Sequence, residues 1–123
     1  MRALIIDDSR AMRSILARML RGLGFEVVEA ANGREALQRL RETGKIELAL
    51  VDWNMPEMSG LDFIRAVRTE HSHDGVLLMM VTTETEMEQI SRALEAGANE
   101  YVMKPFTQEV ILEKLQMLGM AGP

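Results

Sequence analysis

Residues 48–52 (LALVD) place four apolar side chains directly before a carboxylate and a turn, 53–56 (WNMP). A short, unbroken apolar run bounded by turn residues is typical of a strand buried on both faces, as in a parallel sheet between two layers of helices. Asp52 therefore stands at the carboxyl end of a predicted central strand. Open α/β sheets bind their ligands at that edge.

Three further apolar runs end at polar side chains. Residues 3–6 precede Asp7 and Asp8, residues 76–81 precede Thr82, and residues 101–103 precede Lys104. A fifth strand is predicted at 25–30, between the first two helices. Because the carboxyl ends of parallel strands meet at one edge of a sheet, we expect the five polar side chains to converge.

Apolar residues recur at helical spacing in each connection between the strands. Four of these helices have a predicted N-cap: Asn32, Ser59, Thr85 and Thr107. The predicted inward-facing stripes are Met12, Ile15, Leu16, Met19 and Leu20 on the first helix, Met87, Ile90 and Leu94 on the fourth, and Ile111, Leu112, Leu115 and Leu118 on the last.

Strict alternation of strand and helix requires a parallel sheet with helices on both faces. We expect a single α/β domain over residues 1–123, a doubly wound (βα)5 flavodoxin-like fold with strand order 2-1-3-4-5. In that order the first and third strands are neighbours, so Asp7, Asp8 and Asp52 meet.

Composition narrows the function. A net charge of −5 argues against nucleic-acid binding, because phosphate contacts need clustered Lys and Arg. The absence of cysteine excludes disulfides and thiolate metal sites, and no apolar stretch is long enough to span a membrane. We expect a cytoplasmic protein with no membrane contact.

Three clustered carboxylates would repel one another unless a cation or protons neutralised them. Oxygen ligands without His or Cys favour a hard ion, and Mg²⁺ commonly takes one or two carboxylates together with a phosphate. With Lys104 and Thr82 to hold phosphoryl oxygens, a carboxylate is a plausible nucleophile for phosphorus. The alternative is that Asp7 and Asp8 only cap the first helix.

The set formed by Asp7-Asp8, Asp52, Thr82 and Lys104-Pro105, in this order and on these elements, resembles the response-regulator receiver domain of two-component signalling. The resemblance covers essentially the whole chain. It is strongest to receivers of the chemotaxis (CheY) type, in 52–56 (DWNMP), Tyr101 and 104–107 (KPFT). By the same resemblance, we expect a single receiver domain without an effector domain.

The resemblance implies roles for these residues. Asp52 would accept a phosphoryl group from a histidine kinase, a phosphotransfer protein or a small phosphodonor. The receiver would catalyse this step and its own dephosphorylation, without being an enzyme of metabolism. Asp8, Asp52 and the backbone carbonyl of Asn54 would hold Mg²⁺, and Asp7 would act through a bound water.

Thr82 and Lys104 would then bind the phosphoryl group, and Thr82 and Tyr101 would form the switch. Asn54 and Glu84 would tune the lifetime of the acyl phosphate. Thr83 departs from the family, where a smaller Ala is commoner. The Lys104–Pro105 peptide bond is expected to be cis, as it usually is in the family.

Two surfaces are predicted to contact partners. The last helix carries Val110, Lys114 and Met117 beside Tyr101, where receivers usually signal to a target, here possibly a flagellar motor switch. The first helix carries Arg10 and Arg13, which either dock the phosphodonor or form a solvated face. We expect a monomer, or a dimer linked to phosphorylation, and we expect His71 and His73 to be solvated, without carboxylate partners.

Three other functions are alternatives to this one. A single-domain receiver could also be a phosphorelay shuttle or regulate an output other than motility. An aspartyl phosphohydrolase of the haloacid-dehalogenase type needs a second acid two residues after its nucleophile, where Ser9 and Arg10 stand. A flavodoxin-like nucleotide or flavin binder would need glycines after the first strand, and residues 8–12 contain none.

Overall fold

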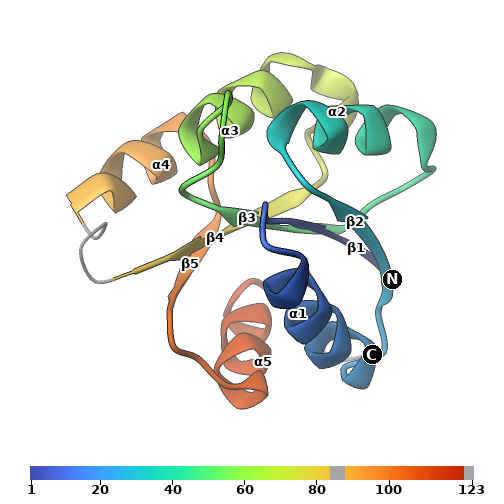
Figure 1. Ribbon diagram of the computed structural model, residues 1–123. Helices are drawn as coiled ribbons and strands as arrows, with labels where there is room; N and C mark the ends of the chain where they lie inside the picture. Colours follow the sequence, from blue (N-terminus) through green and yellow to red (C-terminus); the bar gives the residue numbers. More distant parts are fainter. Residues whose placement is uncertain (84–87, 121–123) are drawn as a thin grey trace.

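The computed structural model describes residues 1–83 and 88–120, the side chain of His71 excepted. Strands and helices alternate along the chain as predicted (Figure 1). The elements are β1 (Arg2–Ile6), α1 (Arg10–Gly22), β2 (Glu26–Ala30), α2 (Gly33–Glu42), β3 (Leu48–Asp52), α3 (Gly60–Thr69), the 3₁₀ turn η1 (His71–His73), β4 (Leu77–Thr82), α4 (Ile90–Ala96), β5 (Glu100–Met103) and α5 (Gln108–Met117).

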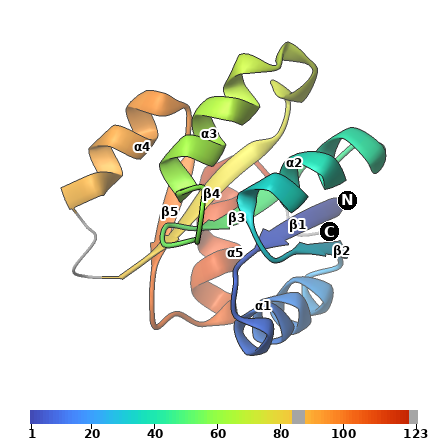
Figure 2. The same ribbon diagram turned by 45° about the horizontal axis from the view of Figure 1, so that its top comes forward.

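The five strands form one parallel sheet in the order β2-β1-β3-β4-β5, which confirms the predicted flavodoxin-like topology (Figure 2). β3 is hydrogen-bonded to β1 on one side and to β4 on the other, and all five of its residues are buried. The unbroken apolar run at 48–51 is explained by this central position, because both faces of the strand are covered.

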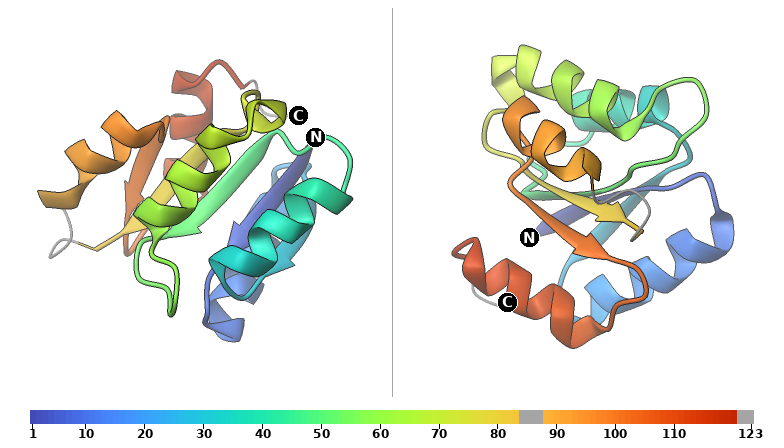
Figure 3. Two further views of the ribbon diagram at one scale, coloured as in Figure 1. Left: turned by 90° about the horizontal axis from the view of Figure 1, so that it is seen from above. Right: turned by 90° about the vertical axis from the view of Figure 1, so that its left-hand side faces the viewer.

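Two layers of helices enclose the sheet (Figures 1 and 3). α1 and α5 cover one face, where Leu16, Leu20 and Ile111 pack against the strands. α2, α3 and α4 cover the other, with Phe63 and Ile64 at the centre of a second core. Among the described residues, no helix is long and apolar enough to cross a membrane.

Three of the four predicted N-caps form. The side-chain oxygens of Asn32, Ser59 and Thr107 each accept a hydrogen bond from the backbone N–H three residues later. The fourth prediction concerns Thr85 and Met87, which lie outside the described residues. α4 itself begins at Ile90, and Gln89 at its N-cap makes no side-chain capping bond within the described part of the chain.

Two of the predicted inward-facing residues are exposed. Ile15 on α1 is 50% exposed and Leu94 on α4 is 44% exposed, whereas Leu16 and Ala93 beside them are buried. Helical periodicity gives the direction of an apolar face, but not how far neighbouring elements cover it. Both side chains lie at the edge of the helix face that packs on the sheet, so the predicted buried faces of α1 and α4 were each too wide by one residue.

Arg68 holds together the end of the molecule opposite Asp52. Its guanidinium donates hydrogen bonds to the carbonyls of Gly97, His73, Asp74 and Val76 and to Asn99 Oδ1, at 2.8 to 3.4 Å. Burial lowers the pKa of this guanidinium from its usual value. One side chain of α3 therefore fixes the segment before β4 and the loop before β5.

Candidate functional site

The three predicted carboxylates meet at the carboxyl edge of the sheet. One carboxylate oxygen from each of Asp7, Asp8 and Asp52 lies within 4.8 Å of the others. β1 and β3 are neighbours, and Ile6 pairs with Val51, so the residues that follow both strands are brought to the same place. Asp7 and Asp52 are 2% and 7% exposed, and Asp8 is exposed.

The alternative role for Asp7 and Asp8, as simple caps of the first helix, does not describe the structure. Ser9 is the N-cap of α1, and its Oγ accepts the Met12 N–H at 3.2 Å. Asp7 Oδ1 accepts the Ser9 N–H at 2.8 Å, while Asp7 Oδ2 is buried and has no hydrogen-bond partner among the described residues. One oxygen of Asp7 therefore supports the loop, and the other is left for something else.

The electrostatics of the cluster are unfavourable. Burial is the main reason that the pKa of Asp52 rises to about 6, and the charge of Asp7 adds to the effect. Burial likewise raises the pKa of Asp7. Lys104 and a backbone N–H partly oppose both shifts, but they do not cancel them. The site holds more negative charge than its own residues neutralise.

A divalent cation fits this site. The orphaned Oδ2 of Asp7 is a buried acceptor without a donor, and carboxylates of Asp8 and Asp52 lie close by. Hard oxygen ligands in this number are those that Mg²⁺ takes, usually with waters completing the shell. Asn54 is exposed, and its N–H donates to Asp52 Oδ1 at 3.4 Å, so its backbone lies beside the cluster.

Lys104 brings a positive charge to Asp52. Its Nζ lies 3.8 Å from Asp52 Oδ1, and its side chain is one quarter exposed. The Lys104 N–H donates to the Thr82 carbonyl at 2.7 Å, which ties the end of β5 to the end of β4. The Lys104–Pro105 bond is cis, as expected from the resemblance.

Thr82 is buried at the end of β4, one position beyond Val81, which pairs with Asp52. Its hydroxyl donates a 3.3 Å hydrogen bond to the Thr83 carbonyl. Asp52 and Thr82 are thus the last residues of β3 and β4, and Lys104 directly follows β5, the next strand of the sheet. Glu84, predicted to tune the phosphoryl lifetime, lies outside the described residues.

The sequence did not predict the roles of two residues next to the acid cluster. Gly60 donates its N–H to the Trp53 carbonyl, and a Cβ at Gly60 would stand 2.8 Å from the Asp52 carbonyl. Glycine therefore lets α3 start directly against the strand end that carries Asp52. Its place immediately after the Ser59 cap was the available signal.

The second missed residue is Arg13, which was predicted only as part of a partner surface. Its Nη1 donates to the Asp7 carbonyl at 2.7 Å, and its Nε lies 3.2 Å from Glu29 Oε1. With 16% of the side chain exposed, Arg13 mainly holds the loop that carries the carboxylates. Arg10, which lies one turn before Arg13 on α1 and was predicted for the same partner surface, is exposed.

Of the residues predicted for the output surface, Lys114 lies against Tyr101, whereas Val110 packs against the core on the other face of the sheet from the core that Tyr101 contacts. Lys114 Nζ lies 4.6 Å from the centre of the Tyr101 ring and 3.4 Å from Glu100 Oε1. Met117 is 68% exposed, and Val110 and Tyr101 are half-buried. A cation over an aromatic ring is a modest but specific attraction, so the positions of Lys114 and Tyr101 depend on each other.

Known proteins agree with this architecture. Residues 3–116 match the family described as the response regulator receiver domain. The chain is 41% identical to the chemotaxis protein CheY1 of Helicobacter pylori over 96% of each chain, and 43% identical to CheY of Pseudomonas aeruginosa over 96% of this chain and 95% of the relative.

Among solved structures, chemotaxis protein CheY4 of Vibrio cholerae superposes with a TM-score of 0.86 and 35% identity, covering 94% of this chain and 96% of that one. A CheY-like receiver protein of Methanospirillum hungatei superposes with a TM-score of 0.83 and 32% identity, covering 95% and 91%. The fold, the order of the polar strand ends and these matches lead to one conclusion: the chain belongs to the response-regulator receiver family of two-component signalling and is similar to its chemotaxis members.

Proposed function

We propose that the chain is a Mg²⁺-dependent phosphoryl switch in which Asp52 accepts a phosphoryl group from a phosphohistidine of a histidine kinase or phosphotransfer protein. The supporting observation is the buried carboxylate cluster with Lys104 Nζ 3.8 Å from Asp52. A carboxylate at the carboxyl edge of a sheet, with a lysine to hold phosphoryl oxygens and two further acids to hold a cation, is suited to attack on phosphorus.

In the proposed step, one Asp52 oxygen attacks phosphorus, the P–N bond breaks, and the imidazole nitrogen leaves with its electron pair and is protonated. Asp52 must be ionised to attack, and its pKa of about 6 leaves it mostly ionised at neutral pH. Asp7, Asp8, Asp52 and the Asn54 carbonyl would hold Mg²⁺, which supplies positive charge to the transferring group. Lys104 and Thr82 would donate to its oxygens.

A groove beside Lys104 supports the proposed docking of the phosphodonor. It has a volume of about 380 Å³ and is lined by Met12, Ile15 and Met19 of α1 and by Pro105 and Phe106. An apolar groove of this kind accepts the apolar face of a helix. Arg10 is exposed in the first turn of the same helix and would add a positive charge at the rim.

The output is proposed to leave through Tyr101, Val110, Lys114 and Met117 toward a target protein in the cytoplasm. Phosphorylation would bias Tyr101 between two positions, since it adds charge at Asp52 and draws Thr82 toward it. Chemotaxis is the proposed pathway, on the basis of the named relatives. A phosphorelay shuttle is the second candidate, because it would use the same site without an output surface.

The deciding experiment treats the protein with Mg²⁺ and phosphoramidate and measures intact mass. The unmutated protein should gain one phosphoryl group, and Asp52→Asn should gain none. A chelator should also abolish the gain, because the incoming anion would otherwise meet three carboxylates. A phosphoryl group that maps to another residue of the unmutated protein would refute the assignment.

The lifetime of the acyl phosphate tests the roles proposed for Asn54 and Glu84. Its decay in the unmutated protein should differ from that in Asn54→Arg and in Glu84→Ala. Asn54 is exposed beside Asp52, where a larger side chain would change the access of water. Equal decay in all three proteins would remove both residues from the proposal.

A further inference from the structure

Arg13 lies in the first turn of α1, beside the loop that carries Asp7 and Asp8. Its side chain is 16% exposed, and its guanidinium contacts two elements at once. Nη1 donates to the Asp7 carbonyl at 2.7 Å, and Nε donates to Glu29 Oε1 on β2 at 3.2 Å. The planar fork of arginine holds two acceptors in fixed directions, which a lysine ammonium does not do.

The backbone of Asp7 is held on both sides. Its N–H donates to the Ala30 carbonyl at the end of β2, at 3.2 Å, and its own carbonyl accepts from Arg13. The Asp7 carbonyl and the Asp8 N–H belong to one planar peptide group, so the bond from Arg13 fixes the orientation of that plane. The plane in turn sets the direction in which the chain presents Asp8.

Asp8 depends on this backbone bond more than Asp7 does. Asp7 is 2% exposed and its Oδ1 accepts the Ser9 N–H at 2.8 Å, whereas Asp8 is exposed. The cap of α1 is Ser9, so the start of the helix does not hold the Asp8 side chain. One oxygen of Asp8 nevertheless lies within 4.8 Å of oxygens of Asp7 and Asp52. The direction of this exposed carboxylate therefore comes mainly from its backbone.

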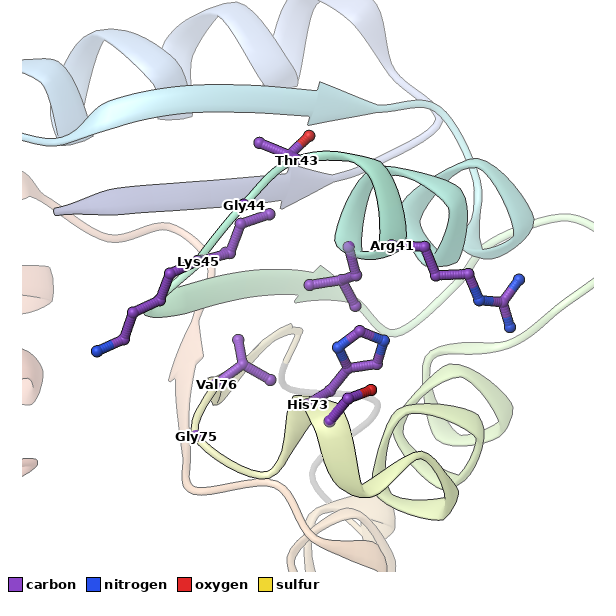
Figure 4. A pocket seen from close by; sticks show the side chains of 10 residues that line it. Arg41, Thr43, Gly44, Lys45, His73, Gly75 and Val76 are labelled. Carbon is purple, nitrogen blue, oxygen red and sulfur yellow. The ribbon is translucent and has the colours of Figure 1, made fainter.

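Arg13 brings little net charge to the carboxylates, because Glu29 offsets its charge. The two side chains are 16% and 39% exposed. Arg41 provides a comparison: it lines a pocket in front of β3 and β4, at the end of the sheet opposite the acid cluster, and it also pairs with one glutamate, Glu70 (Figure 4). Its side chain is 57% exposed. What distinguishes Arg13 is therefore not its ion pair but its bond to the Asp7 carbonyl.

We propose that Arg13 is a positioning residue of the acid cluster, which keeps Asp8 directed at the cation site by holding the Asp7 carbonyl. The inference rests on the proposed cation site and adds that Arg13 sets its affinity without touching the ion. Residues that orient metal ligands commonly change metal affinity by about tenfold or more. Charge alone predicts the opposite sign, because removing a positive charge near three carboxylates should tighten cation binding.

Mn²⁺ is a suitable probe, because it takes the same hard oxygen ligands as Mg²⁺ and its free form is measured by electron paramagnetic resonance. In the absence of a phosphodonor, Arg13→Met should bind Mn²⁺ about tenfold more weakly than the unmutated protein does. Arg13→Lys keeps the charge but loses the fork, so its affinity should fall between those two. Arg41→Met, the matched control, removes the same charge and a similar ion pair, and it should bind Mn²⁺ as the unmutated protein does.

A measurement without metal tests the orientation itself. In ¹⁵N NMR spectra of the full chain, the Asp8 amide signal should be broader in Arg13→Met than in the unmutated protein or in Arg41→Met. Without the guanidinium, the Asp7–Asp8 peptide group is no longer held in one orientation, and exchange between orientations broadens the signal. An Asp8 signal of equal width in all three proteins would contradict the proposal.

Mn²⁺ affinity in Arg13→Met that equals or exceeds that of the unmutated protein would overturn the proposal, as would an equal loss in Arg41→Met. If Arg13→Met does not fold, Arg13→Lys decides, and equal affinity in Arg13→Lys and the unmutated protein would overturn it. The proposed function is judged separately, by phosphorylation of Asp52 in the unmutated protein, which can succeed when the role of Arg13 is refuted. Failure of the unmutated protein to bind Mn²⁺ would overturn both proposals.

Discussion

The acid cluster, which is mostly buried, and the Arg68 network, which is partly buried, both concentrate charge, but their charges are balanced in opposite ways. Around Arg68, one cation meets five oxygen acceptors, and every one of these bonds joins two segments of the chain. Around Asp52, three carboxylates share one lysine, and an oxygen of Asp7 has no donor among the described residues. The Arg68 network therefore stabilises the fold. The acid cluster destabilises it as long as no cation neutralises the carboxylates.

Arg68 provides the largest expected effect. Arg68→Met should lower the free energy of unfolding by about 3 kcal/mol, because several partly buried carbonyls would lose their charged donor at once. Urea denaturation measures the change. Arg65→Met, an exposed position on the same helix, is the control and should change stability by less than about 0.5 kcal/mol. A loss below about 1 kcal/mol in Arg68→Met would mean that the Arg68 hydrogen bonds do not stabilise the fold.

Asp52→Asn should change the free energy of unfolding in the opposite direction and stabilise the protein. The native pKa of about 6 lies above the ordinary value near 4, so the folded protein binds this proton more tightly than the unfolded chain does. The stability that this gives is complete below pH ~4 and is lost as the pH rises through 6. Without metal at pH 7, Asp52→Asn should therefore be more stable, by an amount on the order of 2 kcal/mol.

Urea midpoints from pH 4 to pH 8 check this prediction. The unmutated protein should lose stability over that interval, and Asp52→Asn should lose less. Glu113→Gln removes one exposed carboxylate and controls for net charge. Parallel pH profiles for the unmutated protein and Asp52→Asn would show that the cluster is not strained by its own charge.

Mg²⁺ should remove part of the imbalance at the acid cluster. At a concentration tenfold above its dissociation constant, it should raise the free energy of unfolding by about 1.4 kcal/mol. Asp52→Asn should gain less, because one anionic ligand is lost. The Arg68→Met variant should gain as much as the unmutated protein, since its defect lies at the other end of the sheet. Equal gains in all three proteins would place the ion elsewhere.

Lys114 should give the smallest change in stability. Lys114→Glu loses one partly exposed ion pair and one contact with the Tyr101 ring, so the free energy of unfolding should fall by less than about 1 kcal/mol. Phosphorylation of Asp52 should be nearly intact, while binding to the output target should weaken. Gln116→Glu, an exposed change on the other side of α5, is the control.

Tyr101→Ala sharpens the same point. It should reduce the dependence of target binding on phosphorylation rather than the binding itself, because the ring is the proposed two-position element. Fluorescence anisotropy of a labelled target peptide, with and without phosphoramidate, measures both quantities. Tight binding by Lys114→Glu would move the output face to α1.

The sequence predicted the order of the strands and the meeting of Asp7, Asp8 and Asp52, because both follow from local rules. Apolar runs identify buried strands, and the parallel topology brings their ends together. It did not predict the role of Arg68 or that of Arg13. Their partners are mainly backbone carbonyls, which every residue carries and which leave no mark in a sequence.

His73 was predicted to be solvated, and that is wrong. Its side chain is 11% exposed and lies 3.0 Å from the carboxylate of Glu70. The polar run 70–74 predicts a surface loop, but the turn η1 folds His73 back toward the pocket before β4. A three-residue turn has no periodicity from which its inward side could have been inferred.

The central position of β3 has a consequence for amide hydrogen exchange. β3 is paired along both edges, so the amides of Leu50 and Val51 should exchange only when the whole domain unfolds. β5 is paired along one edge only within the described sheet, and amides such as that of Tyr101 should exchange through smaller openings. The proposed phosphoryl acceptor is therefore carried by the slowest-exchanging strand, and the proposed switch residue by a faster one. Phosphorylation of Asp52 on the rigid central strand would therefore act on Tyr101 in an edge strand that already opens locally.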